Sequence, residues 1–292
     1  MRQAKKVQHS TPIALKKRIR SRFCAGRMES NHLASLVSVK RTADGVARLT
    51  IDHAAKANSL SRALMQEIID ALNELARDET LRAVVVTGAG GKAFIGGANV
   101  DEMAAVDQAG ARNFITLVHR TCDAVRRVPV PTIARIEGYT LGAGLEFAAA
   151  CDIRIASESS TFAMPEVRLG IPSVVEAVLL PRLIGWGRTR LLLLTGRSID
   201  AAAALAWGLV EEAVPAEQLD AMVDRCLADI LASGPQAVRL QKRLIDSWMD
   251  QPIDAAITAS ITEFAAACTG TEKEDRMRAH LEAMRAARRK IE

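Results

Sequence analysis

The spacing of apolar residues between positions 61 and 79 predicts the clearest helix of the chain. Apolar side chains recur there every three or four residues, which is typical of a helix with one buried face. Ser61 stands at the expected start, where a side-chain oxygen can accept a hydrogen bond from a free backbone N–H. The expected buried stripe consists of Leu64, Ile68, Leu72 and Leu75.

Short apolar segments alternate with helices through the first two thirds of the chain. Residues 36–41 and 47–53 predict two strands around a turn at 42–45. Further strands are predicted at 82–88, 130–138 and 152–157, and further helices at 106–128 and 141–151. This order predicts an α/β body built from repeated ββα-like units. It has too few strands for a TIM barrel.

Helices dominate the sequence after about residue 174. They are predicted at 217–233, 235–249, 253–268 and 272–290, with one short strand at 208–214. Such a helical end to an α/β body is typical of an oligomerisation region. We therefore divide the chain into an N-terminal extension (1–34), a core with the active site (35–198) and a helical C-terminal region (199–292).

Composition narrows the class of protein. Hydrophobic residues make up 49% of the chain but aromatic residues only 3%, so the core must consist mainly of Leu, Ile, Val and Ala. No apolar run is long enough to span a bilayer, so no membrane partner is expected. The five cysteines are scattered, odd in number and never spaced as CxxC, which argues against a disulfide framework or a zinc site.

The net charge of +5 arises from the N-terminus. Residues 1–27 hold nine Lys or Arg and no acidic residue, leaving 30 basic and 34 acidic residues in the remainder. The body is therefore mildly acidic, and no nucleic-acid partner is expected. We expect the basic segment to be disordered and dispensable for the chemistry. A cytoplasmic location follows, or the mitochondrial matrix if residues 1–27 are a presequence.

Two turns of small residues are the first candidates for chemistry. Gly96-Gly97-Ala98 and Gly142-Ala143-Gly144 match neither a Rossmann nor a P-loop fingerprint, and the chain has no GxSxG or HExxH motif. Small residues let a ligand approach backbone N–H groups, and the second turn also opens a helix. Two such N–H groups aimed at one point form an oxyanion hole. Alternatively, the small residues only allow the helix to pack on the sheet.

Two glutamates accompany these turns. Glu146 lies one helical turn beyond Ala143, and Glu166 follows Pro165 at the end of a short strand-like run. Carboxylates are seldom fully buried without a partner. Two carboxyl groups in different environments near a polarised carbonyl suit the roles of general acid and general base.

The sequence resembles the crotonase family of enoyl-CoA hydratases and isomerases over about residues 35–292. The resemblance rests on five segments in a specific order and spacing: "KANSL" (56–60), "KAFIGGANVDEM" (92–103), "IEGYTLGAGLEFAAACDIRIA" (136–156), "PEVRLGIP" (165–172) and "AWGLVEEAVP" (206–215).

This resemblance implies a crotonase-type spiral of ββα units, assembled as a homotrimer or a homohexamer, and an acyl-CoA thioester as substrate. The backbone N–H groups of Ala98 and Ala143 would hold the thioester oxygen, and Glu146 and Glu166 would be the catalytic acid and base. No metal or other cofactor is implied. The remaining expected substrate-binding residues are Lys56, Ala57, Gly97, Asn99 and Val100.

An enoyl-CoA hydratase, which adds water across the 2,3 double bond, is the expected activity. The nearest alternatives are a Δ3-Δ2-enoyl-CoA isomerase and another acyl-CoA lyase or hydrolase of the family. An isomerase needs mainly one base, so the presence of both glutamates favours hydration. A non-catalytic acyl-CoA-binding or RNA-associated homologue is a further alternative, but it predicts a lost glutamate or a basic body.

Several positions depart from the family's pattern. Asn99 stands where the family often has an acidic residue, and Asp101 stands where it often has a basic one. His280 replaces an aromatic residue. The segment "SVVEA" (173–177) replaces a glycine-rich loop. This loop adds a third carboxyl group, Glu176, which we expect to matter less than the other two. We expect surface or packing roles for the remaining residues considered: His53, His119, His280, Cys151, Trp207 and Trp248.

Overall fold

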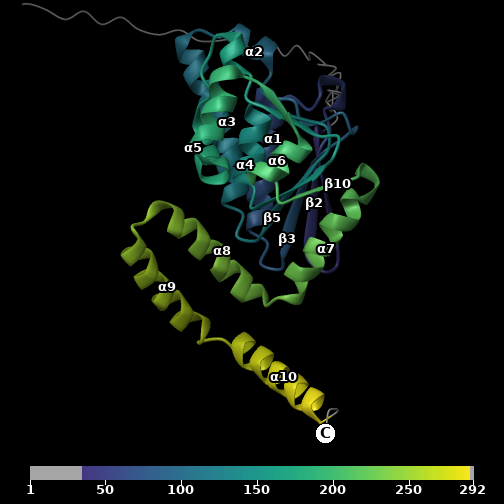
Figure 1. The fold of residues 1–292 in the computed structure, drawn as a ribbon, viewed down its shortest axis with the longest axis vertical. Coiled ribbons are helices and arrows are strands. Elements are labelled where there is room, and N and C mark those ends of the chain that lie inside the picture. Colours follow the sequence, from purple (N-terminus) through teal and green to yellow (C-terminus); the bar gives the residue numbers. More distant parts are fainter. Residues whose placement is uncertain (1–34, 290–292) are drawn as a thin grey trace, which may run out of the picture. The chain divides into compact units, whose positions relative to one another are not determined.

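The computed structural model describes residues 35–289, so the expected N-terminal extension lies outside the described residues. Its larger sheet has six strands in the order β1-β2-β3-β5-β7-β10 (Figure 1). Only the β1–β2 pair is antiparallel. The strands are β1 (Val37–Arg41), β2 (Val46–Ile51), β3 (Ala83–Gly88), β5 (Thr132–Ile136), β7 (Ile153–Ser157) and β10 (Glu212–Val214).

A second, smaller sheet has the order β4-β6-β8-β9. Its strands β4 (Ala93–Ile95), β6 (Tyr139–Leu141) and β8 (Thr161–Ala163) are parallel, and β9 (Ser198–Asp200) runs antiparallel to β8. Each parallel strand of this sheet follows a strand of the larger sheet along the chain. The chain therefore repeats strand, strand, helix, which confirms the predicted ββα units.

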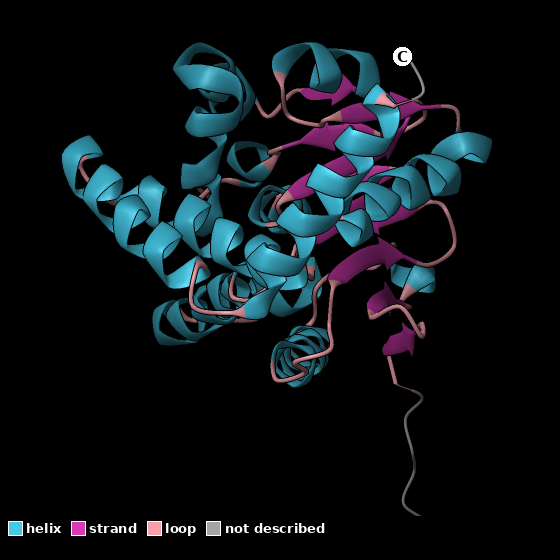
Figure 2. Cartoon of the chain, turned by 90° about the horizontal axis from the view of Figure 1, so that it is seen from below, coloured by secondary structure: helices cyan, strands magenta, loops and turns pink. Residues whose placement is uncertain are grey.

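Helices lie on either side of the strands (Figure 2). They are α1 (Arg62–Ala76), α2 (Val100–Ala104), α3 (Gln108–Arg126), α4 (Ala143–Ala150), α5 (Leu180–Thr195), α6 (Ala201–Trp207), α7 (Leu219–Ala232), α8 (Pro235–Asp250), α9 (Ile253–Ala267) and α10 (Thr271–Arg288). Short 3-10 helices are η1 (Ala54–Lys56), η2 (Glu166–Leu169), η3 (Val175–Leu179) and η4 (Ala216–Gln218).

The first helix forms as its sequence predicts. The Ser61 side chain accepts a hydrogen bond from the Leu64 N–H at 3.2 Å, and the whole predicted stripe of α1 is buried. The four C-terminal helices and the strand at 208–214 are also confirmed. The sequence reading did not separate the three-residue strands of the small sheet, and it did not identify α5.

Two hydrophobic layers cover the larger sheet because side chains alternate between the faces of a strand. In β3, Val84 and Val86 point into the larger cluster with α1, α3 and α4. Ala83 and Val85 point into a smaller cluster that α7 covers. Burial on both faces explains the continuous apolar run of this strand. The larger cluster supports the helices that carry the candidate site.

Gly144 tests how closely α4 must approach the small sheet. A Cβ atom at this position would collide with the Ile95 carbonyl group of β4. Gly144→Ala should therefore destabilise the protein by about 1–3 kcal/mol, as overpacking does. Thermal and urea unfolding would measure the loss.

Gly187 in α5 provides the matched control, since a Cβ atom there meets nothing within 4 Å. Gly187→Ala should leave stability unchanged or raise it, because alanine favours the helix over glycine. Equal effects of the two substitutions would contradict the close packing of α4 on β4.

Candidate active site

The three parallel strands of the small sheet end at the three segments that the sequence singled out. Gly96-Gly97-Ala98 follows β4, Gly142-Ala143 follows β6, and Pro165-Glu166 comes two residues after β8. The carboxyl ends of adjacent parallel strands lie at one edge of a sheet. Segments up to seventy positions apart therefore meet there, and ligands bind characteristically at such edges in α/β proteins.

A cavity of about 180 Å³ lies at this edge. All four residues expected to act in catalysis line it: Ala98, Ala143, Glu146 and Glu166. Gly97 and Val100 line it too, and Met103, Ile115 and Val118 add apolar surface. The arrangement places two carboxyl groups, two small-residue turns and an apolar surface around one small space.

Two backbone N–H groups beside this cavity are free to bind a ligand. Within residues 35–289, neither the Ala98 N–H nor the Ala143 N–H donates a hydrogen bond to a protein group. Ala143 is the first residue of α4, whose opening N–H groups have no partner within the helix. The alternative reading of the small residues also holds in part, because Gly144 serves the packing of α4 on Ile95.

Gly142 positions the second carboxyl group. It adopts a φ of +50°, and a Cβ atom on it would collide with the Glu166 carboxylate. The Ser173 hydroxyl donates to Glu166 Oε2 at 2.8 Å. Glycine at this turn therefore leaves room for Glu166, while Ser173 fixes the orientation of its half-buried side chain.

Glu146 is buried, with 3% of its surface exposed. Burial, followed by the charges of Glu166 and Glu176, raises its pKa to about 8. At neutral pH Glu146 is therefore mostly protonated. A protonated carboxyl group in a cavity can serve as a general acid.

Glu176 is more enclosed than its position in a departing loop suggested, and the expectation that it matters less than the other two carboxyl groups stays a prediction. It lies in η3, which packs on α4, and only 3% of its surface is exposed. Its Oε1 lies 2.7 Å from Nδ1 of His119 on α3. His119 is therefore the partner of a buried carboxylate. The contact could not be predicted from the sequence, because the two residues lie 57 positions apart.

The "KANSL" segment lies beside the first turn. The Gly96 N–H donates to the Ala57 carbonyl at 2.9 Å, and the Leu60 N–H donates to the Gly97 carbonyl at 2.8 Å. Lys56 is exposed, which leaves its ammonium group accessible to an anionic ligand. The cavity itself is not lined by Lys56, Ala57 or Asn99.

Asn99 caps α2, and its side chain accepts a hydrogen bond from the Glu102 N–H at 3.0 Å.

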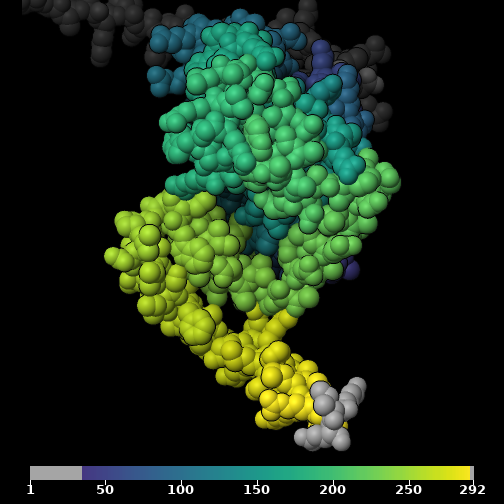
Figure 3. Space-filling model, viewed as in Figure 1, coloured from purple at the N-terminus to yellow at the C-terminus, as the bar shows by residue number. Residues whose placement is uncertain are grey.

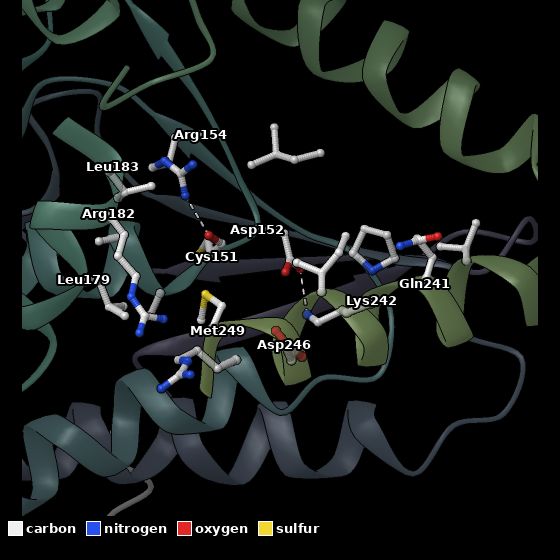
Figure 4. Close-up of a pocket in the computed structure, with 17 residues that line it drawn as sticks. Cys151, Asp152, Arg154, Leu179, Arg182, Leu183, Gln241, Lys242, Asp246 and Met249 are labelled. Carbon is white, nitrogen blue, oxygen red and sulfur yellow. Dashed lines mark hydrogen bonds and ion pairs between the residues drawn. The ribbon is translucent and has the colours of Figure 1, made fainter. Parts of the chain in front are cut away.

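A larger cavity of about 460 Å³ lies between α8 and the end of α4 (Figure 4). Two of its charged side chains have partners within the lining. Lys242 Nζ lies 2.6 Å from Asp152 Oδ2, and Arg154 donates to the Cys151 carbonyl at 2.7 Å. Burial raises the pKa of the Cys151 thiol to about 12, so it is no nucleophile at neutral pH.

The other singled-out side chains have varied surroundings. Cys151 is buried, as expected of a packing residue, whereas Trp248 is 45% exposed and donates to Ser260. The Trp207 ring packs under the Arg188 guanidinium. His280 is exposed on α10.

Within the described residues, no group of three or more His, Cys, Asp or Glu side chains is arranged to hold a metal ion. Across residues 35–289, no helix has the length and apolar character required to cross a membrane.

Comparison with known proteins identifies the family. The sequence pattern of the enoyl-CoA hydratase/isomerase family matches residues 41–287, and the chain belongs to this family. It is 34% identical to the short-chain-enoyl-CoA hydratase of Clostridium acetobutylicum, over 85% of this chain and 93% of that protein.

A crotonyl-CoA hydratase of Syntrophomonas wolfei is also 34% identical, over 82% of this chain and 93% of that protein. The crystal structure of an enoyl-CoA hydratase from Bacillus anthracis aligns with a TM-score of 0.82 at 33% identity, covering 85% of this chain and 97% of that one. The crotonase fold and the family expected from the sequence are confirmed.

The raised pKa of Glu146 predicts how stability depends on pH. The folded protein holds this proton up to about pH 8, whereas a glutamate in the unfolded chain releases it near 4.5. Between these values the folded state binds more protons, so the free energy of unfolding contributed by Glu146 falls as pH rises. The loss is on the order of 5 kcal/mol.

Glu146→Gln removes this titration. The variant should therefore unfold at a higher temperature than the parent protein at pH 9, with little difference at pH 4.5. Glu74→Gln, which changes an exposed carboxylate on α1, is the control and should follow the parent at both pH values. A Glu146→Gln variant no more stable than the parent at pH 9 would show that Glu146 ionises normally.

Proposed function

We propose that the protein is an enoyl-CoA hydratase that adds water across the 2,3 double bond of a 2-enoyl-CoA thioester. The observation that carries this proposal is the single cavity lined by Ala98, Ala143, Glu146 and Glu166. The names of the relatives from Clostridium acetobutylicum and Syntrophomonas wolfei support it.

The free N–H groups of Ala98 and Ala143 stabilise the enolate that forms when water attacks the β-carbon. The thioester oxygen gains negative charge in this step, and a preorganised donor to such an oxygen contributes on the order of 3 kcal/mol. No side chain is needed for this task, which explains why both turns consist of small residues.

The two carboxyl groups carry the protons. The ionised member of the pair accepts a proton from a water molecule while the water oxygen attacks the β-carbon. The protonated member donates its proton to the α-carbon. Hydration consumes one water molecule and leaves the pair with one proton, now on the other carboxyl group. Exchange through a new water molecule restores the starting state. The raised pKa of Glu146 supports its role as the proton donor.

The apolar wall of the cavity accommodates the acyl chain. Ile171 and Pro172 add to this wall, and so does Val174 from the segment that replaces the family's glycine-rich loop. The Val174 side chain occupies space that a glycine would leave open. The small cavity, together with the relatives' names, favours a short substrate such as crotonyl-CoA.

Glu146→Gln and Glu166→Gln test the two-carboxyl mechanism. Each substitution keeps the shape of the side chain but removes its acid–base function, so kcat for crotonyl-CoA hydration should fall about 10²–10⁴-fold. KM should change little, because the CoA moiety binds elsewhere. The loss of the conjugated thioester's ultraviolet absorbance measures the reaction.

An isomerase gives a different pattern with the same two variants. Glu146→Gln would then have a mild effect and Glu166→Gln a severe one, measured with a 3-enoyl-CoA. Near-normal hydration by both variants would exclude the proposed roles of the glutamates.

The C-terminal helices support a further part of the proposal, a trimer-based assembly. Within residues 35–289, α10 has no buried side chain, and Figure 3 shows the surfaces of α9 and α10 open to view. Large apolar residues are exposed along both helices: Ile253, Ile257, Ile261, Phe264, Met277, Leu281 and Met284. Apolar surface of this extent typically marks a protein interface.

Sedimentation of the full chain at micromolar concentration should therefore give a trimer or a hexamer. Phe264→Glu places a charge on this apolar surface and should shift the distribution toward smaller species. A parent protein that sediments only as a monomer would exclude the assembly.

A further inference from the structure

The pair formed by Glu176 and His119 lies beside the candidate site but does not line its cavity. The Glu176 side chain is 4% exposed, whereas that of His119 is 50% exposed. One end of the pair is therefore enclosed by protein and the other is in contact with water. A buried carboxyl group needs a hydrogen-bond partner, and the half-exposed His119 ring supplies one.

The second oxygen of Glu176 lacks a partner. Within residues 35–289, Oε2 is buried and receives no hydrogen bond. A buried polar atom without a donor destabilises the fold, so its presence calls for another explanation. His119 contacts only the other oxygen, Oε1, so Oε2 is left on the enclosed side of the pair.

Glu146 is the titratable group that faces this charge from α4, on which η3 packs. α3 contributes His119 and the buried Cys122 thiol, whose pKa is raised by burial and then by the charges of Glu176 and Glu146. Glu166 of η2 acts on Glu146 from across the cavity.

The other neighbouring elements add no charge at this point. α5 also packs on η3, but its Arg182 lines the larger cavity. β4 has no titratable residue, and Tyr139 of β6 is 47% exposed.

We propose that Glu176, held by His119, is a positioning residue for the proposed hydration: its buried negative charge keeps the proton of the carboxyl pair on Glu146 at neutral pH. Without this charge, Glu146 would release its proton more readily within the neutral range. Glu176 touches no substrate and acts only through Glu146. The inference rests on the proposed function, which makes that proton part of the reaction.

Glu176→Gln tests this role with little change in shape, and Glu176→Ala is a second variant that also removes the charge. Infrared difference spectra of the substrate-free full chain, recorded over a pH series, follow the protonated-carboxyl band. Glu146→Gln identifies the part of the band that belongs to Glu146. In both Glu176 variants the midpoint of this band should fall by about one pH unit. Glu74→Gln, which removes a distant exposed charge, should leave it unchanged.

The pH profile of kcat/KM for crotonyl-CoA provides the second readout. Its alkaline limb should move to lower pH in parallel with the infrared midpoint, which a merely structural role of Glu176 would not cause. An unchanged Glu146 midpoint in a folded Glu176 variant would overturn the proposal. A shifted midpoint in a protein that hydrates no enoyl-CoA would instead support the role of Glu176 and refute the proposed function.

Discussion

The alignment of three short parallel strands, β4, β6 and β8, is the constraint on which the rest of the site depends. Each strand is only three residues long, and each is followed closely by one part of the site. Hydrogen bonds between these strands fix the relative positions of their ends. The larger sheet beneath supplies one strand before each of them. The repeated strand–strand–helix order therefore brings three distant segments to one edge.

Glycines make this convergence sterically possible. At Gly142 a side chain would occupy the place of the Glu166 carboxylate, and at Gly144 it would meet the backbone of β4. The same short segment thus serves both packing and chemistry. Functional and structural explanations of the small residues are not alternatives here, because neighbouring glycines meet different requirements.

Electrostatics in the cavity follows from the same packing. α4 buries Glu146 against η3, and the buried carboxyl group lies close enough to two others for their charges to raise its pKa. An isolated buried glutamate would simply remain protonated. Glu166, half-buried and bonded to the Ser173 hydroxyl, gives the same cavity a second carboxyl group in a different environment.

The sequence by itself determined the elements whose signals are local. The period of apolar residues defined α1 and the C-terminal helices, because it depends on which side of a helix faces the core. Short apolar segments bounded by turn residues predicted the strands of the larger sheet. The five family segments identified Ala98, Ala143, Glu146 and Glu166 as candidates, and the structure brings all four to one cavity. The roles assigned to them stay predictions.

Only the tertiary structure decided how strongly the carboxyl groups interact and which residues surround them. Three-residue strands carry too few positions for a recognisable period, so the small sheet could not be read from the sequence. His119 and Glu176 lie 57 positions apart, on α3 and η3, and no local pattern relates them. Their contact exists because both elements pack against each other and against α4. Burial and charge proximity are properties of that packing, and they set the protonation of Glu146.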